Sequence, residues 1–358
     1  MNIVRLAALV VVWLGLSQAA QAQTVSCAEI ATLPAVISQP GVYCLKKSFS
    51  LSMSDGIAIE VLASNVTIDF NGFKIGNLMA GEETLAMGVG VFERRNVVLR
   101  NGNFRGFMMT IGLLASDPER SSGHLVENMM IDSSLVYGIF AIGNGVVLRN
   151  NQIVNSADTR ISSTSVTRML AKAGASRVNS QLRAMRASRS RASARASASG
   201  VAPQIVTPGV APIMAAVTNS VIERNTISSV RAVGEADGIV VVAGQGVAVR
   251  DNFIAGLRAG GYVAGIGVSD FSENILLQNN TILDGETTGV DTVYGIESLA
   301  AGGVMCLNNV IAGFSTAASF GCVPATCDDG RDDSCTKPTT GAAVSNGRVP
   351  AGTSLRTR

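Results

Sequence analysis

Short alternations of apolar and polar residues recur along most of this chain. In "VAVRDNFI" we expect Val247, Val249 and Ile254 to point inward. Arg250 is expected to point outward, because side chains alternate between the two faces of a strand. The longer stretch "GIVVVAGQGVAVRDNFI" predicts two or three strands of three to five residues, with glycine at the bends where a positive φ or a close backbone approach is needed. The predicted local structure is therefore short strands joined by tight turns.

These units repeat with a nearly constant period. Each closes on an Asn or Gly near an apolar residue, and the closing marks are Gly72, Gly102, Asn128, Asn151, Asn225, Asn252, Asn280 and Asn309. The steps between them are 30, 26, 23, 74, 27, 28 and 29 residues, so the one long step is a period plus an insertion of about fifty residues. A period of this length built from short strands predicts a solenoid in which each repeat is one coil.

The asparagines among the closing marks predict an internal ladder. We expect Asn128, Asn151, Asn225, Asn252, Asn280 and Asn309 to lie above one another at a bend, each side-chain amide bonding to the next. A buried amide without such a partner would be costly. A catalytic role for these residues is disfavoured, since coil after coil carries one.

Composition agrees with strands and turns, and the ends of the rod need separate structures. The chain has 38 glycines and only 4% aromatic residues, which favours strands joined by tight turns. We expect an N-terminal cap with a short helix at Cys27–Thr32, because an open coil would expose unpaired backbone groups. The predicted segments are a signal peptide at 1–22, cap and first strands at 23–55, coils one to four at 56–156, a basic insertion at 157–208, coils five to eight at 209–322, and a loop with a disordered tail at 323–358.

The start of the chain indicates export. Residues 1–22 contain one basic residue, an apolar run and the sequence Ala20-x-Ala22, which are the features of a secretory signal peptide cleaved before Gln23. No later stretch approaches the roughly 20 apolar residues of a membrane-spanning helix. We therefore expect a secreted or periplasmic protein without a transmembrane segment; a retained N-terminal anchor is the less favoured alternative.

Six cysteines agree with export, because disulfides persist in oxidising compartments. They are Cys27, Cys44, Cys306, Cys322, Cys327 and Cys335. We expect the first two to pair, and among the last four we favour the third with the fourth and the fifth with the sixth, although spacing alone leaves other connectivities open. A zinc site is disfavoured because the single histidine, His124, is distant and no C-x-x-C pair exists.

The repeat resembles a known family. The consecutive stretches "DGIAIEVLASNVTIDFNGFKI" and "GVGVFERRNVVLRNGNFRGF" look like the right-handed parallel β-helix of the pectin-lyase-like superfamily, and the resemblance covers about residues 25–322 apart from the insertion. It implies an all-β, right-handed parallel β-helix of about eight coils, with an N-terminal cap and a basic low-complexity insertion. Members include polysaccharide lyases, polygalacturonases, mannuronan epimerases, phage tailspikes and non-enzymatic adhesins, so the resemblance implies a fold and not an activity.

None of the catalytic patterns of these relatives is present. The nearest is Asp117-Pro118-Glu119-Arg120 with His124, which a solvated turn explains equally well. The weak catalytic candidates are Asp237, Arg250 and Asp270; other acidic residues nearby are Glu273 and Asp291. The weak substrate-binding candidates are Tyr137, Tyr294 and Glu297. Register predicts Asp237 and Tyr294 on one face two coils apart, where a ring and carboxylates could hold a sugar chain.

Two charged features have plainer alternatives. Arg149, Glu223 and Arg250 share one outward position in successive coils, so a cross-strand charge ladder competes with a catalytic Arg250. The loop "CDDGRDDSC" offers Ca²⁺ four carboxylates but lacks the spacing of a dedicated calcium loop. These carboxylates, the weak metal candidates, belong to Asp328, Asp329, Asp332 and Asp333.

The insertion is strongly basic. Nine Lys or Arg residues and no acidic residue lie between Thr159 and Ile222, whereas the rest of the chain after the signal peptide carries a net charge of about −8. A solvated loop is the favoured interpretation; the alternatives are an arm that binds acidic polysaccharide or an anionic envelope surface, or one that folds back on the acidic rod. Nucleic acid is disfavoured as a target because the segment has no aromatic residue for base stacking and the protein is expected to be exported.

Two classes of function follow. One is an exported β-helix that binds or processes a polysaccharide, including a lyase or glycoside hydrolase acting on an acidic glycan. The other is a non-catalytic surface or structural β-helix, favoured by the missing catalytic patterns and by the loss of the only tryptophan, Trp13, with the signal peptide. The sequence does not decide whether the protein is an enzyme.

Overall fold

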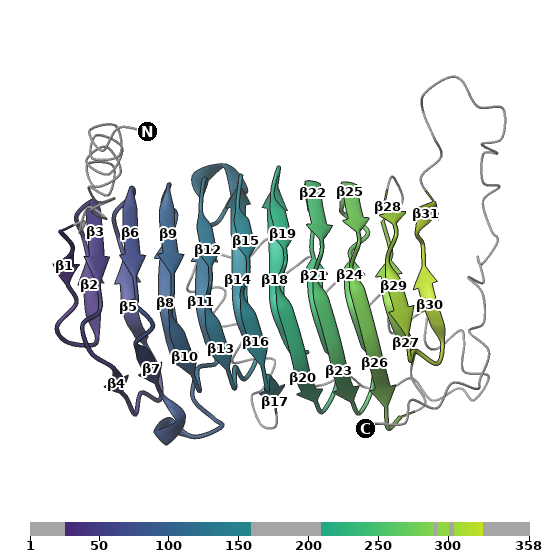
Figure 1. Cartoon of the computed structure of the whole chain (residues 1–358), viewed down its shortest axis with the longest axis horizontal. Helices are drawn as coiled ribbons and strands as arrows, with labels where there is room; N and C mark the ends of the chain where they lie inside the picture. Colours follow the sequence, from purple (N-terminus) through teal and green to yellow (C-terminus); the bar gives the residue numbers. More distant parts are fainter. Residues whose placement is uncertain (1–25, 159–208, 290–291, 301–303, 325–358) are drawn as a thin grey trace, which may run out of the picture.

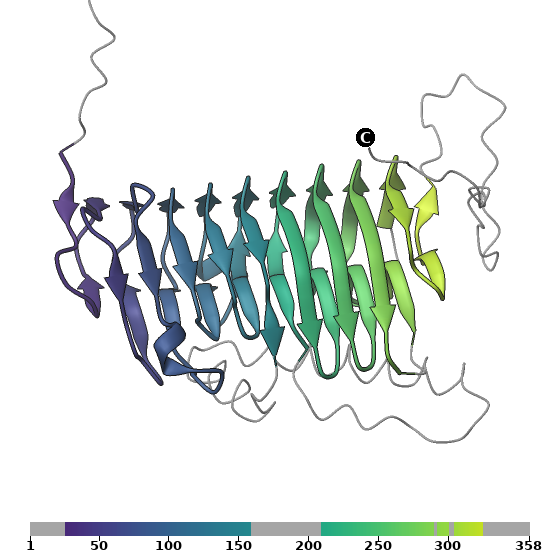
Figure 2. The same cartoon turned by 60° about the horizontal axis from the view of Figure 1, so that its bottom comes forward.

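The coils of this protein stack side by side into a rod that runs from the N-terminus to the C-terminus (Figures 1 and 2). The computed structural model describes residues 26–158, 209–289, 292–300 and 304–324. Within them the chain forms a parallel β-solenoid of about eight turns, so the predicted right-handed parallel β-helix is confirmed. Every strand pairing is parallel, and each coil bonds to the coil before it and the coil after it.

Each full coil contributes one strand to each of three ladders. The first ladder contains β2 (Ala35–Ile37), β5 (Ile57–Val61), β8 (Met87–Phe92), β11 (Met109–Leu114), β14 (Tyr137–Asn144), β18 (Ala211–Thr218), β21 (Ala236–Val241), β24 (Val263–Val268), β27 (Val293–Ser298) and β30 (Ala317–Phe320). The second contains β1 (Ala28–Glu29), β3 (Gly41–Cys44), β6 (Val66–Asp69), β9 (Val97–Arg100), β12 (Leu125–Glu127), β15 (Val147–Arg149), β19 (Val221–Glu223), β22 (Gln245–Arg250), β25 (Glu273–Gln278), β28 (Val304–Leu307) and β31 (Val323–Pro324).

The third ladder faces the other side of the rod. It contains β4 (Phe49–Ser50), β7 (Lys74–Gly76), β10 (Asn103–Arg105), β13 (Met130–Asp132), β16 (Gln152–Val154), β20 (Thr226–Ala232), β23 (Phe253–Ala259), β26 (Thr281–Thr287) and β29 (Val310–Ala312), while β17 (Ala157–Asp158) pairs with the end of β20. Two short 3-10 turns, η1 (Leu78–Ala80) and η2 (Pro118–Arg120), lie in the connections. The strands that contain the stretch 238–254 are six or seven residues long, longer than the alternation predicts. Their pairing with the neighbouring coils continues past the bend, as at Leu257, which pairs with Val230 and with Gly285.

The interior is filled by columns of aliphatic side chains. One such column of the first ladder is Ile59, Val89, Ile111, Ile139, Ile213, Ile239, Ile266 and Ile296. Each of these side chains is at most 1% exposed, and burial of one contributes roughly 1.5–3 kcal/mol. Val247, Val249 and Ile254 are buried and Arg250 is exposed, as their alternation predicts.

The strand register continues across residues 159–208. Ile139 of β14 pairs with Ile213 of β18, and Arg149 of β15 pairs with Glu223 of β19. Coils four and five are therefore direct neighbours although 74 residues separate their equivalent positions. The predicted signal peptide and most of the predicted basic insertion lie outside the described residues. No helix in the described part of the chain is long and apolar enough to cross a membrane.

The predicted asparagine ladder is present from Asn151 to Asn309. Each side-chain Nδ2 donates to the Oδ1 of the next asparagine at 2.9–3.0 Å. The prediction for Asn128 was wrong: its φ is 54° and its side chain is exposed. Met129 occupies the inward position instead, and its backbone N–H donates to Asn151 Oδ1 at 3.0 Å. Asn128 belongs to a neighbouring outer column of left-handed residues, which asparagine tolerates well.

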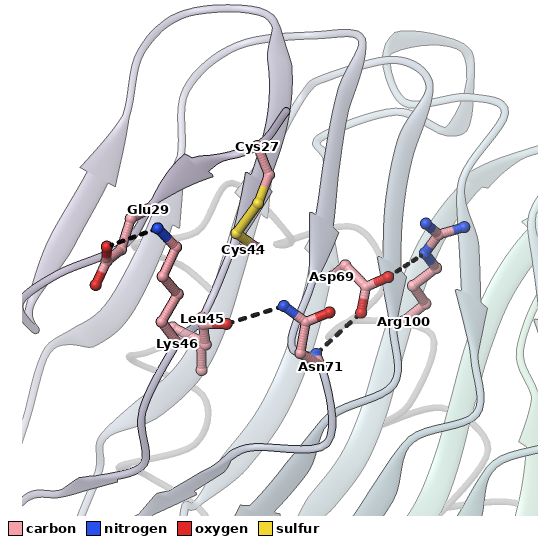
Figure 3. Close-up of a disulfide and its surroundings, with 8 residues drawn as sticks. All are labelled: Cys27, Glu29, Cys44, Leu45, Lys46, Asp69, Asn71 and Arg100. Carbon is pink, nitrogen blue, oxygen red and sulfur yellow. Dashed lines mark hydrogen bonds and ion pairs between the residues drawn. A yellow bond between two sulfur atoms is a disulfide. The ribbon is translucent and has the colours of Figure 1, made fainter. Parts of the chain in front are cut away.

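The N-terminal cap differs from the expected helix. Residues 28–29 form β1, which pairs in parallel with Tyr43–Cys44 of β3, and the Ile30 N–H donates to the Cys44 carbonyl at 2.9 Å. The open edge of the first coil offers these hydrogen bonds, and they outweigh local helix preference. The predicted disulfides Cys27–Cys44 and Cys306–Cys322 are both present, and Figure 3 shows the first of them at the start of the rod.

Candidate binding groove at the carboxyl ends of the first-ladder strands

The sequence-predicted site residues fall on three different parts of the rod. Asp237 and Tyr294 share a column of the first ladder with Ala264 between them, so the predicted register is correct. Glu297 lies on the same strand as Tyr294, in the neighbouring column of outward-facing residues. Asp270 lies in the turn between β24 and β25, and Arg250 ends β22 in the second ladder. The structure thus brings Asp237, Tyr294 and Glu297 onto one face but separates them from Arg250.

This face is less accessible than a solvated sugar platform would be. Asp237 is 4% exposed and Glu297 is 2% exposed, and both take part in polar interactions. The Tyr294 ring lies 6.0 Å from the Tyr262 ring, centroid to centroid. Burial raises the pKa of the Tyr294 phenol, and the charge of Glu297 raises it further. Tyr137 is also buried and stacks on Phe140 at 5.2 Å.

Arg250 belongs to the predicted charge ladder. It pairs with Glu223, Nε to Oε2, at 3.0 Å. The same column of the second ladder contains the pairs Arg149–Glu127 and Arg100–Asp69, the latter drawn in Figure 3. Alternating signs along a parallel ladder remove like-charge contacts between neighbouring strands. The position of Arg250 is therefore accounted for by strand pairing.

A groove of about 490 Å³ lies where the first-ladder strands end. Its central polar residues, Thr218, Gln245 and Glu273, are paired in successive coils, so they form a column parallel to the rod axis. Residues 116–119 close one end of the groove, and the turn that carries Asp270 and Phe271 closes the other. The structure thus brings together the acidic turn 117–119 and Asp270, which lie more than 150 residues apart in the sequence.

Local hydrogen bonds hold the turn that contains Asp270. Ser269 and Ser272 are buried; the Ser269 Oγ accepts from the Ala243 N–H at 3.0 Å, and the Ser272 Oγ accepts from the Gly244 N–H at 3.1 Å. The two serines anchor the turn to the preceding coil and leave Phe271 outside, 46% exposed. Asp270 Oδ1 is shielded from solvent and makes no hydrogen bond with the described residues. The groove therefore has a fixed aromatic ring beside a carboxylate.

The opposite end of the groove is also held in place. Asp117 caps the η2 turn, its Oδ1 accepting from the Glu119 N–H at 3.0 Å. Arg120 and Ser116 both bind Glu93 of the preceding coil. The hydrogen bond from Ser116 lowers the pKa of the Glu93 carboxyl, and the charge of Arg120 adds to this effect. The turn is thus a structured wall that presents Asp117 and Glu119 to the groove.

His124 is not part of this wall. It is 1% exposed; its Nδ1 accepts from the Val97 N–H at 3.2 Å and its Nε2 lies 2.8 Å from the Ser121 Oγ. Burial lowers the pKa of the imidazole to about 4. The sequence grouped His124 with Asp117 and Glu119, but in the fold only the two acidic residues line the groove. His124 is a buried structural residue.

A family model of the right-handed β-helix region matches residues 119–311, more than half of the chain. The chain belongs to the right-handed β-helix family. A comparison with curated proteins found no similar sequence.

Sequence reasoning about this β-helix missed the centre of the groove. Thr218 ends β18 and Gln245 begins β22, and neither carries a charge; Phe271 was not singled out among 11 phenylalanines. Alignment of the coils at all of their bends, and not only at the closing marks, would have found this column, because Thr218, Gln245 and Glu273 occupy equivalent positions in successive coils.

No metal site emerges from the described ranges of the β-helix. There, no three His, Cys, Asp or Glu side chains group in a way that could hold an ion. The four weak calcium candidates, Asp328, Asp329, Asp332 and Asp333, lie outside the described residues, as do Asp291 and the predicted Cys327–Cys335 pair.

Proposed function

We propose that this β-helix binds a neutral or amino-sugar polysaccharide chain in the groove between residues 116–119 and 270–273. The observation that carries the proposal is the exposed ring of Phe271 beside the Thr218–Gln245–Glu273 column, in a groove of about 490 Å³. An aromatic ring offers an apolar surface to a sugar, and amide, hydroxyl and carboxylate groups accept and donate hydrogen bonds to its hydroxyls. The column runs parallel to the rod axis, which suits an extended chain.

The charge of the groove selects among glycans. Asp117, Glu119, Asp270 and Glu273 line it, and no Lys or Arg is among its described lining residues. A clustered negative potential repels a uronate chain and attracts a protonated amine. The acidic glycan expected from the superfamily therefore suits this groove poorly. An uncharged or glucosamine-containing chain suits it better.

Titration calorimetry of the mature chain tests this assignment. The probes are hexamers of glucose, glucosamine and galacturonate, each with and without added calcium. We expect heat from the glucose or glucosamine hexamer and none from galacturonate. Phe271→Ala should weaken binding by about tenfold or more, since loss of a stacking ring costs at least about 1.4 kcal/mol.

The control is Phe253→Ala, which removes a similarly exposed ring from the third ladder. It should leave affinity unchanged. Binding of galacturonate alone, or equal affinity in Phe271→Ala and the unchanged chain, would contradict the proposal.

Hydrolysis of the bound chain is a second candidate, favoured by one observation. Carboxylates from two separate turns face the same groove, and Asp270 has an oxygen shielded from solvent. Glycoside hydrolases use two such carboxyl groups on either side of the scissile bond. Release of reducing ends from the bound hexamer, lost in both Asp270→Asn and Glu119→Gln, would support it. Intact hexamer after prolonged incubation would leave binding as the function.

A further inference from the structure

An apolar patch on the outward face of the first ladder is buried although it lies outside the rod's interior. Its members include Met87, Met109, Tyr137, Phe140, Met214 and Val240, and each of these is at most 3% exposed. They lie on the same strands as the inward aliphatic column, either directly after it or two residues before it, and form a cluster separate from the interior core. A sheet face of this kind is buried only when another layer of chain packs on it. We call this surface the outer patch.

The outer patch becomes acidic toward the C-terminal coils. Asp237 follows Tyr137 and Ala211 in one column, and Glu297 follows Phe140, Met214 and Val240 in the next. Glu235, Asp237 and Glu297 are at most 4% exposed, and each takes part in a polar interaction. Buried carboxylates are held by cations or by hydrogen-bond donors. The layer that covers the patch should therefore be apolar at one part and basic at another.

The described elements do not supply this layer. Only the three residues of η2 are seen among them to pack across β14 and β18, and they are too few to cover a face that extends from β8 to β27. Arg120 of η2 pairs with Glu93, and the other arginines whose ion pairs the structure shows lie elsewhere, as in Arg250–Glu223 of the second ladder and Arg258–Glu286 of the third.

Residues 159–208 match the required layer in position, length and charge. The segment leaves the rod after Asp158 and returns at Gly209, two residues before Ala211 of the outer patch. Its fifty residues include nine Lys or Arg and no acidic residue. Before its Arg/Ser/Ala-rich part it contains apolar residues at broken helical spacing, among them Val166, Met169, Leu170 and Leu182. By contrast, the tail after Pro324 starts from the last coil and has nearly balanced charge.

We propose that the outer patch is the docking surface for residues 159–208 of the same chain. The apolar residues of the segment cover the Met, Tyr and Phe side chains, and its arginines reach Asp237 and Glu297. The basic segment is then bound by the acidic rod itself. An anionic envelope surface or an acidic polysaccharide would have to compete with the rod for this segment. This inference does not depend on the groove binding a glycan.

Methionine oxidation measures the cover directly. Peroxide converts accessible methionine to its sulfoxide, and peptide mass spectrometry gives a rate for each site. In the mature chain we expect Met109 and Met214 to react at least about tenfold more slowly than Met79, which is 80% exposed. When a short Gly-Ser linker replaces residues 159–208, both should react at a rate close to that of Met79. Met129, in the interior core, should stay protected in both proteins and reports that the rod is folded.

A second variant decides the outcome if the linker protein fails to fold. It keeps the full chain and replaces the nine basic residues of 159–208 with Gln; we expect faster oxidation of Met214 while Met129 stays protected. The proposal is overturned if Met109 and Met214 react as fast as Met79 in the unchanged chain, or if both variants keep them protected. Protection that appears only in a dimer, measured by light scattering, would assign the outer patch to a second copy and would also overturn it.

Discussion

At the scale of one residue, Asn252 shows why asparagine recurs at the inner bend of this rod. Its Nδ2 donates to the Ile222 carbonyl and to Asn280 Oδ1, both at 2.9 Å. Its Oδ1 accepts from the backbone and side-chain N–H groups of Asn225, both at 3.0 Å. One planar amide thus satisfies groups of three coils away from water, where an unpaired polar group is expensive. No other side chain has this donor and acceptor set at this length.

Asn252→Asp should therefore destabilise the rod although the two side chains have nearly the same shape. The new oxygen would face the Ile222 carbonyl and Asn280 Oδ1, so two hydrogen bonds become repulsive contacts and a buried charge is added. We expect the free energy of unfolding in urea to fall by about 3 kcal/mol or more. Asn150→Asp is the control, because Asn150 is exposed with a φ of 54° that aspartate tolerates. Equal stability of the two variants would show that the column is not a buried network.

The single histidine predicts a pH dependence with a definite sign. His124 is neutral in the fold because burial lowers its pKa from 6.5 to about 4, whereas the unfolded chain takes up a proton near 6.5. The stability that this group contributes is complete above pH 6.5 and is lost as pH falls toward 4, a loss of about 3 kcal/mol.

Urea unfolding curves across this pH range measure the effect. His124→Gln retains hydrogen-bonding groups but does not titrate. Its stability should change less between pH 6.5 and 5 than that of the unchanged chain, in a window where most carboxylates stay ionised. The same slope in both proteins would assign the dependence to the carboxylates instead.

At the scale of elements, alternation and period predicted which residues form strands and which columns they share. The pairing of Asp237 with Tyr294 through Ala264 follows from counting residues alone. Counting failed at Asn128 because this asparagine lies one position too early in its coil: Glu127 pairs with Arg149 and Met130 with Gln152, so the residue opposite Asn151 is Met129. Counting also failed at the cap, where we expected a helix and the structure has β1. The open edge of β3 with which β1 pairs is formed by another part of the chain, so the local sequence does not reveal it. The groove was missed for a similar reason, since turns from different coils create it.

The cap offers a prediction at this scale. Cys27–Cys44 joins the residue before β1 to the end of β3 across a separation of 17 residues (Figure 3). Loss of this bridge in Cys44→Ser should lower stability by about 2–4 kcal/mol. β1 has only two strand residues to hold it, so limited proteolysis should then start before β5. Cys306→Ser, which opens the bridge at the other end, should instead start proteolysis at the C-terminal coils. Cleavage that begins at the same place in both variants would contradict the assignment of the first bridge to the cap.

At the scale of the whole molecule, the rod is a series of coils that each contact only their neighbours. Its stability should then be a sum of coil and interface contributions, and its length should not be essential to the fold. Function is distributed differently. The groove needs Thr218, Gln245 and Glu273 from three successive coils, and the outer patch extends over more. A change in the number of coils should therefore separate the fold from the proposed binding.

Removal of one complete coil provides that separation. Deletion of residues 225–251 joins Arg224 to Asn252, and Arg224 is equivalent to Asp251: both have a φ above 50° and both N–H groups bond to the following coil. The asparagine ladder then continues from Asn151 to Asn252. We expect a strand-rich circular dichroism spectrum and a single melting transition at a lower temperature, because one coil and one interface are lost. Gln245 leaves with the deleted coil, so binding of the hexamer at the groove should be lost or weakened by at least about tenfold.

Deletion of residues 225–238, about half a coil, is the control: it places inward residues outside and should prevent folding. A folded half-coil variant, or an unfolded full-coil variant, would refute the modular description of this rod.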